Sequence, residues 1–260
     1  MREVYPQRRA GTIEPFPVDA VAQAIRSPPP MDDAHFTEPT TAYWQAFAGP
    51  AADEAPPWRH GYPARLPDGR RLVLPIRRLA AEPRHAVASL ILNQASFEVA
   101  EALADLLAAR VAAAAPDVVV GLPTLGLPLA AAVARRLGHA RAVPLGTSRK
   151  FWYDDALSVP VQSITSPTPG KRLYLDPHQR PLVAGRRVLI VDDAVSTGVT
   201  LGAAWSLLEA LGAQVVGAGV AMRQGRRWAD ALGAARAAAV TGVFDSPLLQ
   251  AVPGGWVERA

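Results

Sequence analysis

The chain has 260 residues, half of them hydrophobic, so it is long enough for a sizeable buried core and too apolar to be intrinsically disordered. It carries 27 Lys and Arg against 23 Asp and Glu, a formal net charge of +4, and its arginine pairs are scattered. This mild balance argues against a dedicated nucleic-acid surface, and the absence of cysteine excludes disulfides, cysteine-bound zinc and a thiol nucleophile.

The first part of the chain differs in composition from the rest. Twelve of the 25 prolines precede residue 68, a density that disfavours regular helices and strands. We therefore predict a loosely ordered leader over residues 1–57 and a main domain over 58–260. Met31 follows three prolines, so a translation start there stays open. Neither a signal-peptide stretch nor a run long enough to span a bilayer is present, which predicts a cytoplasmic protein.

Three features precede the first predicted buried strand. The aromatic residues of segment 41–47 could dock on the domain. Residues 62–66 and 70–76 flank Pro67-Asp68-Gly69, a pattern that predicts a β-hairpin within 58–80. From 84 to 115 apolar residues recur every three or four positions, which predicts one long helix. Gln94 and Ser96 lie in or beside its apolar stripe, either hydrogen-bonded at a packing seam, which we favour, or contacting a base.

Residues 81–249 alternate between short apolar runs and helical patterns. This alternation predicts an α/β domain with a mostly parallel sheet flanked by helices, and 250–260 reads as a coil tail. The predicted strands lie at 117–120, 141–144, 171–175, 188–191, 214–222 and 237–244, and the predicted shorter helices start at residues 127, 198 and 226. A long loop over 146–170 interrupts the pattern, and such loops are uncommon unless functional.

The stretch 186–201 is the most informative. Residues 188–191 are apolar, as in a strand buried on both faces, and Asp192 and Asp193 end the run. The small polar residues that follow lead into a helix whose N-terminus suits a phosphate. Two acids would repel that phosphate unless they face ribose hydroxyls or a hydrated Mg²⁺. A ligand with a sugar diol at one end and a 5′-phosphate at the other satisfies both halves.

This stretch resembles the phosphoribosyl-pyrophosphate (PRPP) signature of type I phosphoribosyltransferases, in which four apolar residues and two acids precede a Ser/Thr-Thr-Gly-x-Thr turn. The likeness spans roughly residues 87–249. It implies that Asp192 and Asp193 hold the ribose hydroxyls and bind Mg²⁺, directly or through ribose and water. It also implies a 5′-phosphate turn made of Ala194, Val195, Ser196, Thr197, Gly198, Val199 and Thr200.

The resemblance assigns pyrophosphate to two further segments. Thr124, Leu125 and Gly126 match the family's pyrophosphate loop, although Leu125 stands where many members have a basic residue. The loop 146–170 takes the place of a mobile loop that closes over PRPP. Its basic pair Arg149 and Lys150 resembles the loop opening in the adenine enzymes, where a basic side chain neutralises the leaving pyrophosphate.

The acceptor side is less defined. The resemblance places Phe244 and Asp245 where members often meet the base, and it makes the hairpin of 58–80 either a hood over the base or a plain sheet extension. Trp152 and Tyr153 either stack on the base or anchor the loop, and we favour anchoring.

By resemblance, the predicted activity is transfer of the 5-phosphoribosyl group from PRPP to a purine-like base, with Mg²⁺, in a homodimer with no nucleic-acid or membrane partner. Asp192, Asp193, Arg149 and Lys150 would carry the catalysis. The alternative is a non-catalytic regulatory protein that binds PRPP or a nucleotide. The acceptor base and the oligomeric state are not readable from the sequence.

Overall fold

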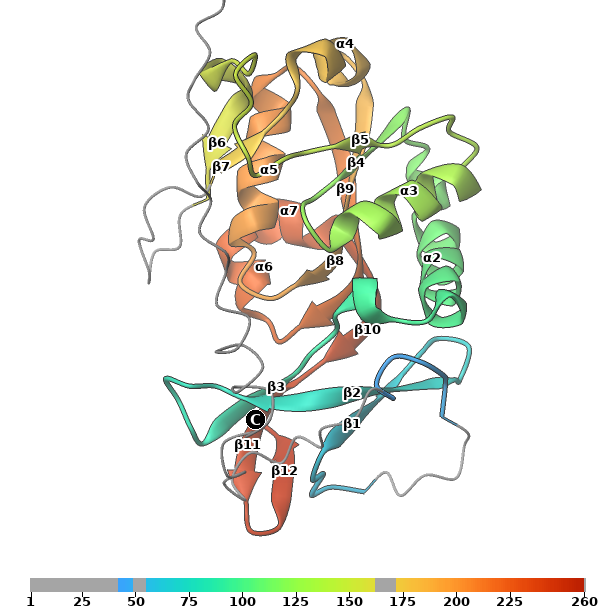
Figure 1. Ribbon diagram of the computed structural model, residues 1–260, viewed down its shortest axis with the longest axis vertical. Coiled ribbons are helices and arrows are strands. Elements are labelled where there is room, and N and C mark those ends of the chain that lie inside the picture. Colours follow the sequence, from blue (N-terminus) through green and yellow to red (C-terminus); the bar gives the residue numbers. More distant parts are fainter. Residues whose placement is uncertain (1–41, 49–54, 162–171, 260) are drawn as a thin grey trace, which may run out of the picture. The chain divides into compact units, whose positions relative to one another are not determined.

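The computed structural model describes residues 42–48, 55–161 and 172–259, all within one compact unit, Phe36–Ala260. Most of the predicted leader, including Met31, lies outside the described residues. Residues 162–171, which are the rest of the predicted loop and the first residue of the strand predicted at 171–175, also lie outside them. The described residues form two five-stranded sheets, a two-stranded ribbon and flanking helices (Figure 1).

The first sheet, here the core sheet, is parallel throughout and confirms the α/β prediction. Residues 188–191 and their neighbours on adjacent strands are apolar because both faces of this sheet are covered. In spatial order the strands are β10 (Val240–Ser246), β9 (Gln214–Gln224), β8 (Arg187–Val195), β4 (Val118–Gly121) and β5 (Val143–Pro144).

Helices cover both faces of the core sheet, and the side chains of β8 divide accordingly (Figure 1). Leu189 and Val191 pack with α2 (Phe97–Val111) and α3 (Gly126–Arg136) in one core cluster. Val188 and Ile190 pack with α5 (Val199–Ala210) in the other. The period-two alternation of a strand thus sorts one apolar run into two cores. Shorter helices are α4 (Arg180–Val183), α6 (Arg227–Leu232) and α7 (Ala234–Ala238).

The second sheet, here the hood sheet, is antiparallel and contains the predicted hairpin. Strands β1 and β2 pair across the turn, where Gly69 takes a positive φ of 85°. The aromatic segment docks beside this sheet, because Trp44 is buried and its Nε1 donates to the Ser89 carbonyl at 3.1 Å. The strand order is β1 (Gly61–Arg65), β2 (Arg71–Arg78), β3 (His85–Ala88), β11 (Leu248–Val252) and β12 (Gly255–Glu258).

The prediction of one helix from 84 to 115 was wrong in its first part. Residues 85–88 form β3, with Ala86 and Ala88 buried and their neighbours half-exposed, which is a strand pattern. The helix α2 begins only at Phe97, where the Ser96 hydroxyl accepts the Val99 N–H at 3.2 Å as an N-cap. Ser96 is hydrogen-bonded, but at a helix start rather than at a packing seam. Short 3₁₀ turns lie at Leu92–Gln94 and Ala112–Ala114.

The prediction of a coil tail over 250–260 was also wrong. Strands β11 and β12 form a hairpin that turns at Gly254, and β11 pairs with β3. Trp256 is only 1% exposed and its backbone bonds that of Trp58. The proline at 253 and the glycines at 254 and 255 mark a tight turn, not the end of regular structure.

The long loop keeps some structure of its own. Strands β6 (Ser158–Pro160) and β7 (Arg172–Tyr174) pair as an antiparallel ribbon, and β7 lies within the strand predicted at 171–175. Further 3₁₀ turns are Asp155–Leu157 and Pro177–Gln179. Among the described residues, no helix is both long and apolar enough to cross a membrane.

The burial of Trp256 gives a direct test of the hood sheet. Trp256→Ala is expected to lower the free energy of unfolding by about 3–5 kcal/mol, because a large buried side chain leaves a cavity. Trp152→Ala, at a position 47% exposed, is the matched control and should cost far less. Chemical denaturation measures both, and equal small losses would show that residues 250–260 do not pack as β11 and β12.

Candidate functional site

The candidate site lies at the carboxyl edge of the core sheet. Strands β4, β8 and β9 are parallel neighbours, so the segments that follow them gather at one edge. This edge is where open α/β sheets bind ligands. The structure therefore brings together the acid pair at the end of β8 and residues 122–126 after β4.

The acid pair lies within β8, which continues beyond the predicted strand end to Val195. Asp192 is half-buried, while Asp193 is only 9% exposed and its backbone N–H donates to Asp192 Oδ1 at 2.9 Å. Burial raises the pKa of Asp193 above its ordinary value, because a carboxylate loses hydration inside the protein. The two acids thus differ in environment, one accessible and one enclosed.

The loop after β4 packs directly against this pair. A Cβ at Gly126 would lie 2.5 Å from Asp192 Oδ1 and 3.0 Å from the Val191 carbonyl oxygen, so only glycine fits there. The Leu122 N–H donates to the same Val191 carbonyl at 2.9 Å. The peptide bond between Pro123 and Thr124 is cis. Helix α3 then starts at Gly126 with its first N–H groups free of a side-chain cap.

The turn after β8 is the second glycine-dependent feature. Gly198 has a φ of 78° and is the N-cap of α5, whose first N–H groups face the turn. A Cβ at Gly198 would lie 2.9 Å from the Trp228 carbonyl oxygen, so α6 packs against the turn. Ser196 and Thr197 are exposed, and Val195 is buried beneath them. An exposed hydroxyl pair over a helix N-terminus is suited to an anion.

The basic pair of the long loop is exposed, and the contacts of Arg149 stay within the loop. Arg149 Nε donates to Asp155 Oδ1 at 2.9 Å, and this carboxylate raises the pKa of the guanidinium. Trp152 Nε1 donates to Asp176 Oδ2 at 3.1 Å, and the Tyr153 ring lies 5.8 Å from that of Tyr174. These contacts agree with the anchoring interpretation of Trp152 and Tyr153.

Phe244 and Asp245, the two residues of β10 predicted to contact a base, have other partners in the structure. Phe244 is 5% exposed and packs in the core cluster beside α2 and α3. Asp245 is exposed, but both of its carboxylate oxygens accept from Arg223, at 2.7 and 2.9 Å. The structure thus leaves Phe244 as a core residue, with Asp245 in an ion pair.

The turn after β8, residues 194–200, is here called the signature turn. A cavity of about 280 Å³, here the inter-sheet cavity, lies between the signature turn and the hood sheet. Its walls include Ser196 and Thr197 on one side and Val87 and Leu248 on the other. Gln224, at the end of β9, also lines it and donates its Nε2 to the Ala88 carbonyl at 2.9 Å. That bond orients the amide, so its Oε1 stays available to accept a hydrogen bond.

Sequence reasoning missed Gln224 and three arginines that also line the inter-sheet cavity: Arg226, Arg227 and Arg259. The available signal was weak. The arginines follow ordinary strands, and residue 259 reaches this cavity because β12 pairs with β11 and β11 pairs with β3.

The acid pair, the loop after β4 and the turn after β8 thus meet at one edge of the core sheet, and comparison with known proteins identifies the family of the chain. Residues 89–236 match the sequence model of the phosphoribosyl transferase domain, and the chain belongs to that family.

Individual relatives are similar over part of the chain. The adenine phosphoribosyltransferase of Mycolicibacterium smegmatis is 40% identical over 126 residues, which cover 48% of this chain and 62% of that protein. The enzyme of the same name from Thermosynechococcus vestitus is 35% identical over 129 residues, or 50% of this chain and 70% of that one.

Solved structures share the fold. Adenine phosphoribosyltransferase from Giardia lamblia, complexed with 9-deazaadenine, aligns with a TM-score of 0.53 at 19% identity, covering 66% of this chain and 93% of that one. The Rhodothermus marinus enzyme aligns with a TM-score of 0.52 at 23% identity over the same shares.

The raised pKa of Asp193 predicts a pH-dependent stability. The folded protein holds this proton more tightly than the unfolded chain, so stability falls as the pH rises from the ordinary value of 3.8 through the raised pKa. Asp193→Asn removes this cost, and the ligand-free variant should melt at a higher temperature than the parent at pH 7. The difference should shrink toward about pH 4. Scanning calorimetry measures it, with the exposed Asp105→Asn as control; a lower melting temperature at pH 7 would contradict the burial cost.

Proposed function

We propose that this protein transfers the 5-phosphoribosyl group of PRPP to a purine-like base and releases pyrophosphate. The observation that carries the proposal is the meeting of three features at one edge: the Asp192–Asp193 pair, the loop that Gly126 lets approach it, and the Gly198 turn at the start of α5. Family membership and relatives named adenine phosphoribosyltransferase support it.

In this proposal the acids and the turn divide the substrate between them. Asp192 and Asp193 accept hydrogen bonds from the ribose hydroxyls, and the turn 194–200 holds the 5′-phosphate. The positive end of the α5 dipole and the N–H groups of its first turn stabilise that phosphate. Residues 124–126 offer backbone N–H groups to the pyrophosphate, which explains how the loop works without a basic residue at Leu125.

The carboxylates of Asp192 and Asp193 suit a magnesium ion that binds together with the substrate. No group of three or more His, Cys, Asp or Glu in the described ranges could hold a metal ion by itself. The two acids would hold Mg²⁺ together with substrate and water oxygens, which agrees with the preference of this ion for few protein carboxylates. When bound, the ion neutralises charge on the diphosphate.

Charge stabilisation is the main demand of the reaction. The bond from C1 of the ribose to the diphosphate breaks while a base nitrogen bonds to C1, so positive charge grows on the sugar and negative charge on the leaving group. Arg149 and Lys150 supply positive charge for that leaving group. Arg149 is held by Asp155 in the structure, so it exchanges this partner for the diphosphate when the loop engages.

The inter-sheet cavity is the proposed acceptor site, and the hood sheet is its cover. A cavity of about 280 Å³ between Thr197 and Leu248 has room for a base. The free Oε1 of Gln224 would accept from an amino or ring N–H group of the base. We extend the hood beyond the expected 58–80 to all five strands of the sheet, within a catalytic domain of 58–260 that acts in the cytoplasm as a homodimer.

The acid pair provides the central test. The double variant Asp192→Asn, Asp193→Asn is expected to lose turnover by at least about a thousandfold while keeping its circular dichroism, because the ribose loses both acceptors. Mass spectrometry detects nucleotide product from PRPP, Mg²⁺ and a panel of purines and pyrimidines, with Asp105→Asn as a matched control. Retained activity would contradict the assignment, and PRPP binding by the parent without any product would favour the regulatory protein.

The close approach of Gly126 gives a separate test. Gly126→Ala should weaken PRPP binding by more than about tenfold, or ~1.4 kcal/mol, because the methyl group displaces the loop from Asp192. Gly146→Ala is the matched control, since its Cβ would meet nothing closer than the Tyr153 hydroxyl at 4.0 Å. Titration calorimetry measures both affinities; equal affinities would place PRPP elsewhere.

A further inference from the structure

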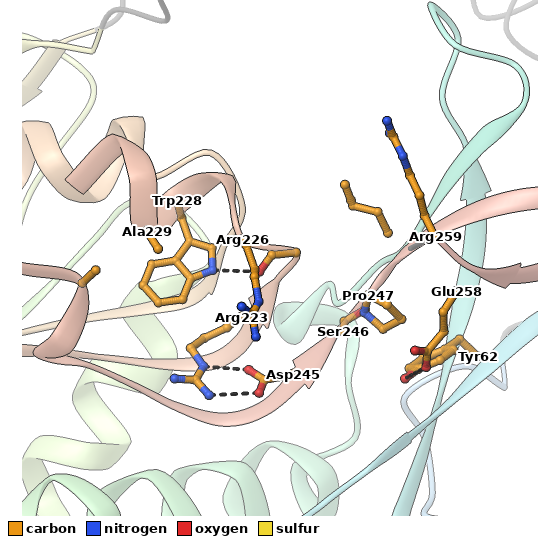
Figure 2. Close-up of a pocket in the computed structure, with 13 residues that line it drawn as sticks. Tyr62, Arg223, Arg226, Trp228, Ala229, Asp245, Ser246, Pro247, Glu258 and Arg259 are labelled. Carbon is orange, nitrogen blue, oxygen red and sulfur yellow. Dashed lines mark hydrogen bonds and ion pairs between the residues drawn. The ribbon is translucent and has the colours of Figure 1, made fainter. Parts of the chain in front are cut away.

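A second cavity of about 780 Å³, here the outer cavity, lies beyond the edge strand β10. None of the acid pair, the signature turn or the 124–126 loop lines it. It shares Gly225, Arg226, Leu248 and Arg259 with the inter-sheet cavity, and its other lining residues belong to it alone. Figure 2 shows Trp228 and the Arg223–Asp245 pair on one wall, Tyr62 and Glu258 on the other, and Ser246 between them.

Ser246 is the first sign that the outer cavity binds a ligand. It is 2% exposed, lines the cavity, and its Oγ has no hydrogen-bond partner among the described residues. A buried hydroxyl left without a partner costs free energy, so such groups usually meet a ligand or water.

The wall opposite is aromatic and held in place. Trp228 is 7% exposed, and its Nε1 donates to the Gly225 carbonyl at 3.0 Å, which orients the indole (Figure 2). Arg223 lies 5.9 Å from the ring centroid, and Asp245 neutralises it through two hydrogen bonds. The alanines at 229 and 237 extend the apolar surface. Such a wall suits a planar ring.

The charges of the outer cavity favour an acidic ligand. Arg226 and Arg259 line it, and neither forms an ion pair with a described residue. Glu258, which precedes Arg259 in the chain and lies on the same side of the cavity (Figure 2), accepts from the Tyr62 hydroxyl at 3.4 Å. Burial, with Glu258 nearby, raises the pKa of Tyr62 to about 12, so the phenol stays protonated and adds no negative charge. Within the described part of the chain, the lining therefore holds two guanidinium groups without an ion pair and one hydrogen-bonded carboxylate.

We propose that the outer cavity is a second binding site, for a planar aromatic ring that carries a phosphate or a carboxylate. The ring lies along Trp228, the acidic group meets Arg226 and Arg259, and the Ser246 hydroxyl bonds a polar atom of the ligand. The volume falls in the range of small-molecule sites and exceeds what a phosphate alone would fill. This inference does not rest on the transfer reaction.

The experiment counts AMP bound to full-length protein that is already saturated with PRPP and Mg²⁺, without acceptor base, by equilibrium dialysis. PRPP then occupies the signature turn, and one further equivalent of AMP is expected. PRPP binding is measured first, so that a failure of the protein to bind PRPP is seen separately from the AMP result. If PRPP does not bind, AMP is titrated into the free protein and into the same variants. Displacement of PRPP by AMP, with no further equivalent bound, would overturn the proposal.

Probe compounds separate the parts of the proposed ligand. Adenosine and inorganic phosphate should each bind at least about tenfold more weakly than AMP, since adenosine lacks the acidic group and phosphate lacks the aromatic ring. Benzoate distinguishes the two kinds of acidic aromatic ligand. If benzoate binds as tightly as AMP, the site takes aromatic acids in general, and if benzoate binds more weakly, the site takes nucleotides. Equal binding of adenosine or of phosphate would overturn the proposal.

Variants locate the second equivalent. Arg226→Ala with Arg259→Ala should weaken AMP binding by more than about tenfold, whereas Arg227→Ala, which lines only the inter-sheet cavity, should change it less than about twofold. Ser246→Ala should weaken binding several-fold while the melting temperature stays equal or rises, because an unpartnered hydroxyl is removed. An effect of Arg227→Ala equal to that of the pair, or unchanged affinity in Ser246→Ala, would overturn the proposal.

Discussion

The close contact between the Gly126 backbone and the end of β8 is the constraint on which the candidate site depends. With no Cβ at 126, the loop after β4 reaches Asp192, so segments some 65 residues apart present one continuous polar edge. Gly198 does the same for the turn after β8, where α6 lies too near for a side chain. The absence of a Cβ at these two positions lets the loop after β4 approach β8 and the turn after β8 approach α6.

The core sheet and the acid pair were predictable because their signals are local. A run of apolar residues ended by two acids, then a Thr-Gly turn, contains its own strand, ligand contacts and helix start. The hairpin around Gly69 was equally local, since the turn residues and the two strands adjoin in sequence. The secondary structure of these elements can be predicted without knowing where the rest of the chain lies.

The acceptor side was not predictable, because its walls come from distant strands. Residues 85–88 read as helix until β2 and β11 pair on either side of them. Gln224 ends a strand like many other polar residues, and only its bond to the Ala88 carbonyl turns it into an oriented acceptor. Phe244 was given a base-contacting role by resemblance to the family, but its side chain is buried in the core cluster that includes residues of α2.

The pairing of Trp58 with Trp256 joins the beginning and the end of the described domain in one sheet. During synthesis, the core sheet has all its strands once β10 has left the ribosome, yet β3 still lacks its neighbour. The nascent chain thus contains every strand of the core sheet before the hood sheet can be complete. The order of translation therefore lets the domain form in two stages. The core sheet can form first, and the hood sheet can be completed only after residues 248–258 have been synthesised.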